Sequence, residues 1–152
     1  MEEGKWCGSL PLEEARSSPG VVAHDGWIYV IGGLQKRKVL SSVCRYSPTM
    51  DQWEPLESLP IPLVYSVIIV QKNLIWVLGG MNCDFQPVSS TWSFNTITLS
   101  WSSGPQLQQV RRGGFGFLHS NRWTMLLGRK LFFPEVYPVR AGCSCAAAQA
   151  PA

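Results

Sequence analysis

The sequence predicts an all-β protein built from repeated four-stranded antiparallel units, and two observations carry this prediction. The first is a pair of apolar segments, Trp27–Ile31 and Leu74–Leu78, each of which ends at a Gly-Gly pair. Short runs of β-branched and aromatic residues bounded by glycine indicate buried strands with a sharp exit. The second is that the two glycine pairs lie 47 residues apart, which indicates a repeat.

Further landmarks keep this spacing. Trp53 lies 20 residues after Gly33, and Trp101 lies 21 residues after Gly80. An aromatic residue precedes each tryptophan by seven positions, and these two residues are Tyr46 and Phe94. A third, shorter unit starts near Arg111 and reaches Gly128, where Arg129 replaces the second glycine. The chain therefore repeats a unit of nearly constant length.

This pattern resembles the kelch repeat, whose period is about 50 residues. The resemblance rests on the glycine pair, the aromatic residue and the later tryptophan, and it covers roughly residues 5–128. It implies a β-propeller in which each repeat forms one four-stranded blade. We therefore expect a partial kelch propeller, open rather than closed, with two complete blades and parts of two others.

The landmarks divide the chain into five segments. The expected segments are the end of a preceding blade (1–15), two kelch repeats (16–60 and 61–108), a partial repeat (109–130) and a non-repeat tail (131–152). The two repeats should contribute strands at 21–23, 27–31, 43–46 and around Trp53, then at 67–70, 74–78, 90–95 and 99–102, with a polar loop at 34–40. The tail contains small residues and prolines, so we expect it to be disordered. We interpret this ending as that of a truncated or alternatively ended kelch-domain protein.

Composition excludes several classes of protein. The net charge is +3, only 15% of residues are charged, and the start at Met1-Glu2-Glu3 lacks the basic and apolar regions of a secretory signal. No apolar run is long enough to cross a membrane. Five cysteines without pair spacing indicate a reducing compartment. We expect a cytoplasmic protein, with the nucleus as the alternative, and no nucleic-acid partner because the basic end lacks an aromatic–basic motif.

Catalytic chemistry is not expected. His24 and His119 are the only histidines, and the acidic residues are scattered without the paired spacing of general acid–base catalysis. Cys143 and Cys145 lie in the tail without further ligands, so we expect no metal site and no cofactor. The alternative is a propeller enzyme of the galactose-oxidase or sialate-epimerase type, which would require metal-ligating side chains on several loops.

The resemblance implies that partners bind to the loops before each innermost strand and after each glycine pair. Candidate binding residues are Arg16, Ser18, Gln35, Lys36, Arg37, Tyr65, Met81, Asn82 and Arg112. Four of them are cations that together would form a basic mouth suited to an acidic peptide. A different interpretation stays open: the charge run at 36–38 is then a solvated loop, and Arg16 and Arg112 brace adjacent blades. Leu63 occupies the position of Arg16 in the second repeat.

We expect a non-catalytic protein–protein interaction module. The resemblance includes adaptors that join a kelch propeller to a BTB domain and present substrates to ubiquitin ligases, although these 152 residues contain no BTB-like helical segment. Actin binding, also known among kelch proteins, is the alternative. An open stack of blades leaves apolar faces and unpaired edges, so we also expect self-association.

Overall fold

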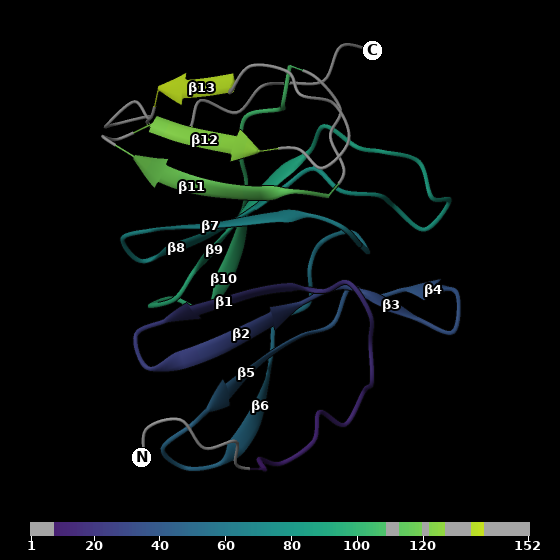
Figure 1. Ribbon diagram of the computed structural model, residues 1–152, viewed down its shortest axis with the longest axis vertical. Helices are drawn as coiled ribbons and strands as arrows, with labels where there is room; N and C mark the ends of the chain where they lie inside the picture. The colour runs from purple at the N-terminus through teal and green to yellow at the C-terminus, as the bar shows by residue number, and fades with distance from the viewer. Residues whose placement is uncertain (1–7, 109–112, 120–121, 127–134, 139–152) are drawn as a thin grey trace.

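The computed structural model describes residues 8–108, 113–119, 122–126 and 135–138. Every regular element in these residues is a β-strand, and the strands form three larger sheets stacked one above another, with a separate two-stranded sheet beside them (Figure 1). Each sheet is antiparallel throughout. No helix of the described part is long and apolar enough to cross a membrane. The predicted all-β architecture of an open, partial propeller is therefore confirmed.

Two of the sheets are complete four-stranded blades. Blade 1 has the order β1-β2-β5-β6, and blade 2 has the order β7-β8-β9-β10. The strands of blade 1 are β1 (Gly20–His24), β2 (Trp27–Ile31), β5 (Val43–Ser47) and β6 (Gln52–Leu56). Those of blade 2 are β7 (Val67–Gln71), β8 (Leu74–Leu78), β9 (Thr91–Asn95) and β10 (Ser100–Ser103). The strands that alternation and glycine spacing predict are all present.

The third sheet contains a strand that the sequence did not predict. Blade 3 has the order β11-β12-β13, with β11 (Phe115–His119), β12 (Arg122–Leu126) and β13 (Glu135–Pro138). Residues 135–138 lie in the segment that we expected to be a disordered tail, yet β13 pairs with β12 from Arg122↔Pro138 to Met125↔Glu135. Pro138 has no N–H to donate, but the end of an edge strand tolerates proline. The expectation was wrong for these four residues.

A small hairpin replaces the expected polar loop at 34–40. Strands β3 (Leu34–Gln35) and β4 (Lys38–Val39) pair antiparallel and form a separate two-stranded sheet. Figure 1 shows this hairpin projecting from one end of blade 1. A strand of two residues is too short to show the alternation of apolar and polar residues by which strands are recognised in a sequence.

Glycine is required at the exit of β2. Gly32 has φ +60°, and a Cβ there would lie 2.3 Å from the carbonyl oxygen of Leu63. The backbone that leaves β2 therefore passes against the segment that leads into blade 2. Gly79 and Gly80 repeat the conformation with φ values of 59° and 101°.

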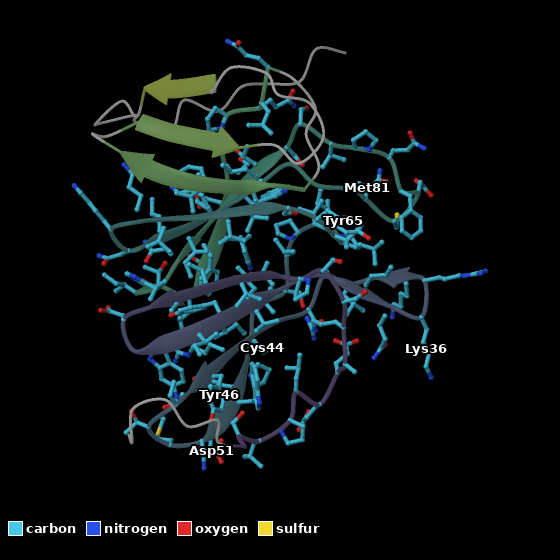
Figure 2. The ribbon with its side chains drawn as sticks, in the orientation of Figure 1. Lys36, Cys44, Tyr46, Asp51, Tyr65 and Met81 are labelled. Carbon is cyan, nitrogen blue, oxygen red and sulfur yellow. The ribbon has the colours of Figure 1, made fainter. Side chains whose placement is uncertain are left out.

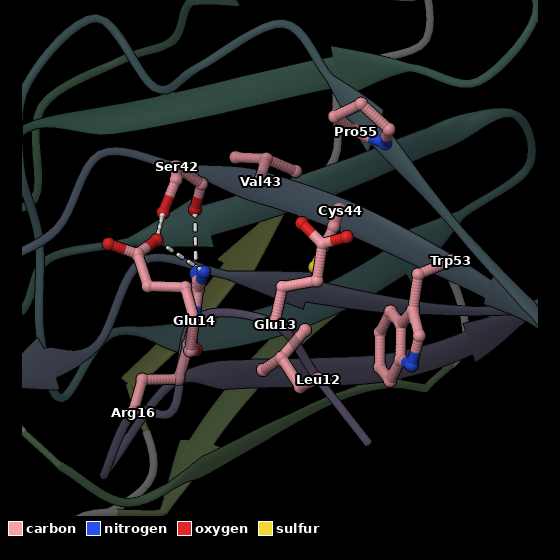
Figure 3. A pocket seen from close by; sticks show the side chains of 9 residues that line it. All are labelled: Leu12, Glu13, Glu14, Arg16, Ser42, Val43, Cys44, Trp53 and Pro55. Carbon is pink, nitrogen blue, oxygen red and sulfur yellow. Dashed lines mark hydrogen bonds and ion pairs between the residues drawn. The ribbon is translucent and has the colours of Figure 1, made fainter. Parts of the chain in front are cut away.

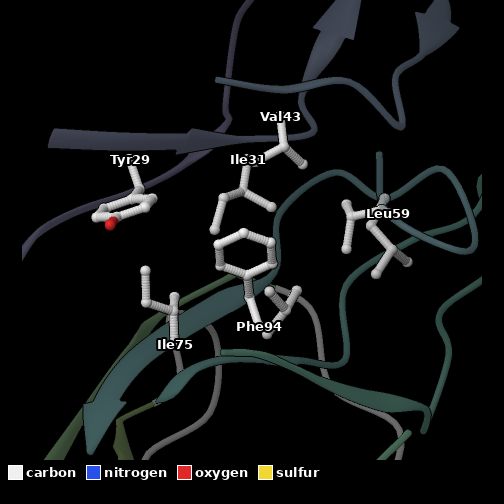
Figure 4. Close-up of a cluster of buried hydrophobic side chains, with 8 residues drawn as sticks. Tyr29, Ile31, Val43, Leu59, Ile75 and Phe94 are labelled. Carbon is white, nitrogen blue, oxygen red and sulfur yellow. The ribbon is translucent and has the colours of Figure 1, made fainter. Parts of the chain in front are cut away.

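The main core lies between blades 1 and 2. Tyr29, Ile31 and Val43 of blade 1 pack with Ile75 and Phe94 of blade 2, and Leu59 of the connection closes the cluster (Figure 4). The Tyr29 and Phe94 rings lie 6.3 Å apart in a tilted arrangement. One face of each sheet is thus buried against its neighbour, which is how repeat architectures build a continuous core.

Candidate partner-binding surface

One end of the stacked blades carries the loops that the sequence analysis singled out. These are the segments before β1 and β7, the β3–β4 hairpin and the loop after β8. Figure 2 shows Lys36, Tyr65 and Met81 at the same side of the molecule, away from Tyr46 and Asp51. Loops of separate repeats therefore meet on one side, as the predicted binding face requires.

The tip of the β3–β4 hairpin presents two cations in a fixed turn. Lys36 and Arg37 are exposed and have φ values of 43° and 71°. Two central residues with positive φ form a type I′ turn, which usually contains Asn-Gly because other residues are strained there. Gln35 and Lys38 close the turn as paired residues. No described residue forms an ion pair with Lys36 or Arg37.

A small apolar cluster joins this hairpin to blade 2. Val39, Val64 and Met81 are buried together, with Leu34 packed against them. Val64 and Met81 also exchange backbone hydrogen bonds of 3.0 and 2.8 Å. Met81, a candidate binding residue, is only 7% exposed. It therefore positions the loops rather than offering its side chain at the surface.

Ser18 and Tyr65 occupy equivalent positions, 47 residues apart, just before the inner strands. Both are exposed and have positive φ, 50° for Ser18 and 58° for Tyr65. The backbone links them in series, because Tyr65 N–H donates to the Ser18 carbonyl oxygen at 3.5 Å and Gly113 N–H donates to the Tyr65 carbonyl oxygen at 2.8 Å. The Tyr65 ring is thus held at the surface, 42% exposed, by an ordered backbone.

Asn82 organises the loop that follows β8. Its Oδ1 accepts hydrogen bonds from the N–H groups of Asp84 and Gln86, both at 3.0 Å. Half-buried Asn82 therefore shapes the loop, as asparagine often does in turns. The loop exposes Phe85, which the sequence analysis did not single out. The sequence feature that could have identified Phe85 is its position as an aromatic residue inside a polar loop.

Arg16 has a structural role, but its contacts lie within the first repeat and the segment just before it, and they do not brace adjacent blades. Its side chain is 3% exposed, and its Nη2 pairs with Glu14 at 2.8 Å. Its Nη1 donates to the carbonyl oxygen of Ser42 at 3.0 Å (Figure 3). The same nitrogen donates to the carbonyl oxygen of Gly32 at 3.1 Å. The guanidinium thus ties the segment before β1 to the exit of β2. Arg112 lies outside the described residues.

A cavity of about 190 Å³ lies beside this clamp, away from the loops (Figure 3). Leu12, Cys44, Trp53 and Pro55 line it together with the clamp residues. Burial raises the pKa of the Cys44 thiol, and the nearby Arg16 guanidinium opposes this only in part. A thiol with a raised pKa is a poor nucleophile. No group of three or more potential metal ligands occurs among the described residues.

Comparisons with known proteins agree with this geometry. Residues 15–60 match the Kelch motif. The chain is 36% identical over 114 residues to beta-scruin of Limulus polyphemus, covering 70% of this chain and 12% of that protein. It is 37% identical over 82 residues to human kelch-like protein 41, covering 53% of this chain and 14% of that one.

Among solved structures, that of YjhT matches with a TM-score of 0.75 at 18% identity. This likeness, which concerns the fold alone, covers 83% of this chain and 49% of that chain. The chain thus spans less than a fifth of the curated relatives named here and about half of this structural neighbour. With its matched motif, its relatives and its four-stranded blades, the chain belongs to the kelch-repeat family.

Proposed function

We propose that this chain is a non-catalytic protein-binding module that recognises an acidic segment of its partner. The recognition site is the loop surface, which we define as the exposed residues Ser18, Lys36, Arg37, Tyr65 and Phe85. The observation that carries the proposal is the strained turn at Lys36 and Arg37, which presents two cations without a described ion-pair partner.

The loop surface combines two kinds of contact. Arg37 can donate to a carboxylate in a planar fork, and Lys36 adds a second positive charge. Tyr65 and Phe85 offer aromatic area, which often supplies most of the binding energy at protein interfaces. The cluster of Val39, Val64 and Met81 ties the hairpin to blade 2, so little ordering cost remains on binding. Asp84 is the one acidic side chain of the neighbouring loop and would repel the same partner.

The names of the relatives support a role in larger assemblies. Matches include an F-box/kelch-repeat protein of Arabidopsis thaliana and a kelch repeat and BTB domain-containing protein of cowpox virus. Presentation of a bound partner to a ubiquitin ligase is therefore the context that we propose for this module. Actin binding and a cytoplasmic location stay predictions, since no described feature favours them.

Binding is tested by fluorescence anisotropy with a labelled Glu- and Asp-rich peptide that contains one leucine. We expect saturable binding that weakens with salt, because exposed charges are screened. K36N should weaken binding about two- to fivefold, the effect of one exposed charge pair. K72N is the matched control, since Lys72 is also an exposed turn lysine with positive φ (52°), at the opposite end of blade 2.

Equal effects of K36N and K72N would show a non-specific attraction to basic groups and would contradict this site. A Lys-rich peptide of the same length should not bind. Binding of that peptide, or salt-independent binding, would contradict recognition of an acidic segment.

A further inference from the structure

The segment before β1 contains an exposed serine that is followed directly by proline. Ser18 is exposed, and Pro19 is half-buried. No described residue forms a hydrogen bond with the Ser18 hydroxyl, whereas the neighbouring Ser17 hydroxyl donates to the Leu34 carbonyl oxygen at 3.3 Å. The Ser18 hydroxyl is therefore accessible to another protein.

The sequence contains one other Ser-Pro pair, Ser47-Pro48, and its serine is buried. Ser47 is 5% exposed at the end of β5, and its hydroxyl oxygen accepts a hydrogen bond from the Met50 N–H at 3.3 Å. Strand β5 lies between β2 and β6, so Ser47 cannot enter the cleft of another protein unless blade 1 opens. Of the two pairs, only the one before β1 is thus accessible in the folded chain.

The fold does not require proline at position 19. The second repeat has Ser66 at the equivalent position, 47 residues later. Pro19 packs against the exit of β2, since a Cβ on Gly33 would lie 3.3 Å from the Cα of Pro19. Ser66 fills the same place in blade 2, where a Cβ on Gly80 would lie 2.5 Å from the Oγ of Ser66. Because serine can occupy this place, packing alone does not explain the proline.

Ser18 lies within the loop surface, close to its two cations. The adjacent Ser17 pairs with Leu34 at the base of the β3–β4 hairpin through two backbone hydrogen bonds of 2.8 Å. Lys36 and Arg37 form the tip of the same hairpin. A phosphate group on Ser18 would carry a charge of about −1.5 to −2 at neutral pH, which is enough to offset both cations.

The backbone at Ser18 is strained in the folded chain. Its φ of 50° lies in the left-handed region, which is unfavourable for residues other than glycine. A protein kinase binds the segment around the accepting serine in an extended form, so this strain is relieved on binding. The relief partly offsets the loss of the hydrogen bonds between Ser17 and Leu34.

We infer that Ser18 is a phosphorylation site for a proline-directed protein kinase, and that its phosphorylation weakens binding at the loop surface. The second statement rests on the proposed function, the recognition of an acidic segment. In the reaction, Oγ of Ser18 bonds to the γ-phosphorus of a nucleoside triphosphate, the bond from that phosphorus to the nucleoside diphosphate breaks, and the hydroxyl proton is released. The phosphate then repels the acidic segment that the cations attract.

The first test measures the modification alone. The purified 152-residue chain is incubated with ATP, Mg²⁺ and a mitogen-activated protein kinase, which requires proline directly after the accepting serine, and the modified residue is identified by mass spectrometry. We expect one phosphoryl group, on Ser18. P19S, which reproduces the second repeat, should keep the circular dichroism spectrum of the natural chain but lose the modification. S47A is the matched control and should keep it.

A natural chain that stays unmodified would overturn the site. Modification of Ser47 in preference to Ser18, or modification of P19S as fast as that of the natural chain, would also overturn it. These outcomes do not depend on whether the loop surface binds a peptide, so they test the site even if the proposed function fails.

The second test compares binding of the acidic peptide to the phosphorylated and the unmodified chain by fluorescence anisotropy. We expect the Kd to rise about five- to tenfold on phosphorylation, because the phosphate opposes two exposed cations. S18E should weaken binding in the same direction. T98E is the matched control for net charge, because Thr98 is exposed in the turn between β9 and β10, at the opposite end of blade 2, and it should change the Kd less than twofold.

Equal binding by the phosphorylated and unmodified chains would overturn the regulatory role and leave the proposed function in place. Equal effects of S18E and T98E would overturn it too, because they would show a response to net charge rather than to position. Absence of binding by the unmodified chain would instead contradict the proposed function, and the regulatory role with it, while the modification site is judged by the first test.

Discussion

The indole N–H of Trp101 donates to the carbonyl oxygen of Glu57 at 2.8 Å, and this contact repeats one unit earlier. There the indole N–H of Trp53 donates to the carbonyl oxygen of Leu10 at 2.9 Å. Each indole also packs on the aromatic residue of the neighbouring strand, with ring centroids 5.0 Å apart. The outer strand of each blade thus holds the chain segment that arrives from the preceding repeat.

W101F should destabilise the protein by about 1 kcal/mol more than W92F does, because it removes a hydrogen bond in addition to ring area. The indole nitrogen of Trp92 is buried without a described hydrogen-bond partner. W92F is therefore a matched control, because it removes ring area without removing a hydrogen bond. Urea unfolding followed by circular dichroism gives both values. Equal losses would show that the Glu57 contact does not contribute.

R16L should lower the free energy of unfolding by about 2–3 kcal/mol, because it removes the Arg16 donor from the Gly32 and Ser42 carbonyl groups and leaves the Glu14 carboxylate without its cationic partner. The double variant E14I/R16L reproduces Ile61 and Leu63 of the second repeat and should cost less than R16L alone. The same urea titration separates the two variants. A double variant less stable than R16L would contradict the view that an apolar pair can replace this clamp.

Stability should depend on the ionisation of Asp51. A hydrogen bond from the Tyr46 hydroxyl, with a second from the Leu10 N–H, lowers the pKa of Asp51 below its ordinary value of 3.8. Because the pKa is lower in the folded state, this stabilisation is present above pH 3.8 and is lost as the pH falls through the folded value.

D51N keeps an oxygen acceptor and tolerates the φ of 50° at this position, but it does not titrate. Thermal melts from pH 7 to pH 2 should therefore show a smaller acid-induced loss for D51N than for the natural chain. All other carboxyl groups are common to both proteins, so identical pH profiles would exclude this contribution.

K36N/R37G should raise the free energy of unfolding by about 0.5–1 kcal/mol while it weakens peptide binding. Asn-Gly is the preferred pair for a type I′ turn, so the substitution relieves the backbone strain at both positions. The opposite signs of the two effects separate binding from folding. Lower stability, measured by urea unfolding, would contradict the strained-turn interpretation.

G32A should cost more than 3 kcal/mol, roughly, since it combines a positive φ with a Cβ pressed against the Leu63 carbonyl group. G26A is the matched control: Gly26 has φ +77° but nothing within 4 Å of an added Cβ, so about 1 kcal/mol is expected. Chemical unfolding measures both. Similar losses would mean that the close approach at Gly32 does not stabilise the fold.

Much of the fold was predictable because its signals are local. The apolar runs that end at Gly32-Gly33 and Gly79-Gly80 place two of the long strands, and the aromatic residue and the tryptophan that follow each glycine pair place the outer strands. The β3–β4 hairpin was missed because its strands have two residues each. Strand β13 was missed because Pro138 and the loss of repeat spacing favoured a loop.

The binding surface was less predictable because it depends on contacts between loops. The sequence indicates which loops share one end of the blades, but not how deeply each side chain is buried. Arg16 turned inward toward two carbonyl groups, and Met81 joined an apolar cluster with Val39 and Val64. These choices depend on groups 16 to 42 positions away in sequence, so no local pattern contains them.

The proposed binding surface is tested most directly by an amide NMR titration of the labelled chain with the acidic peptide. If the loop surface binds the peptide, we expect chemical-shift changes only at the loop end of the blades, at residues 17–18, 35–38, 64–66 and 82–86. The turns at residues 25–26 and 72–73, at the opposite end, should not change. Shifts at those turns, or no shifts at peptide concentrations that saturate the anisotropy signal, would contradict the account.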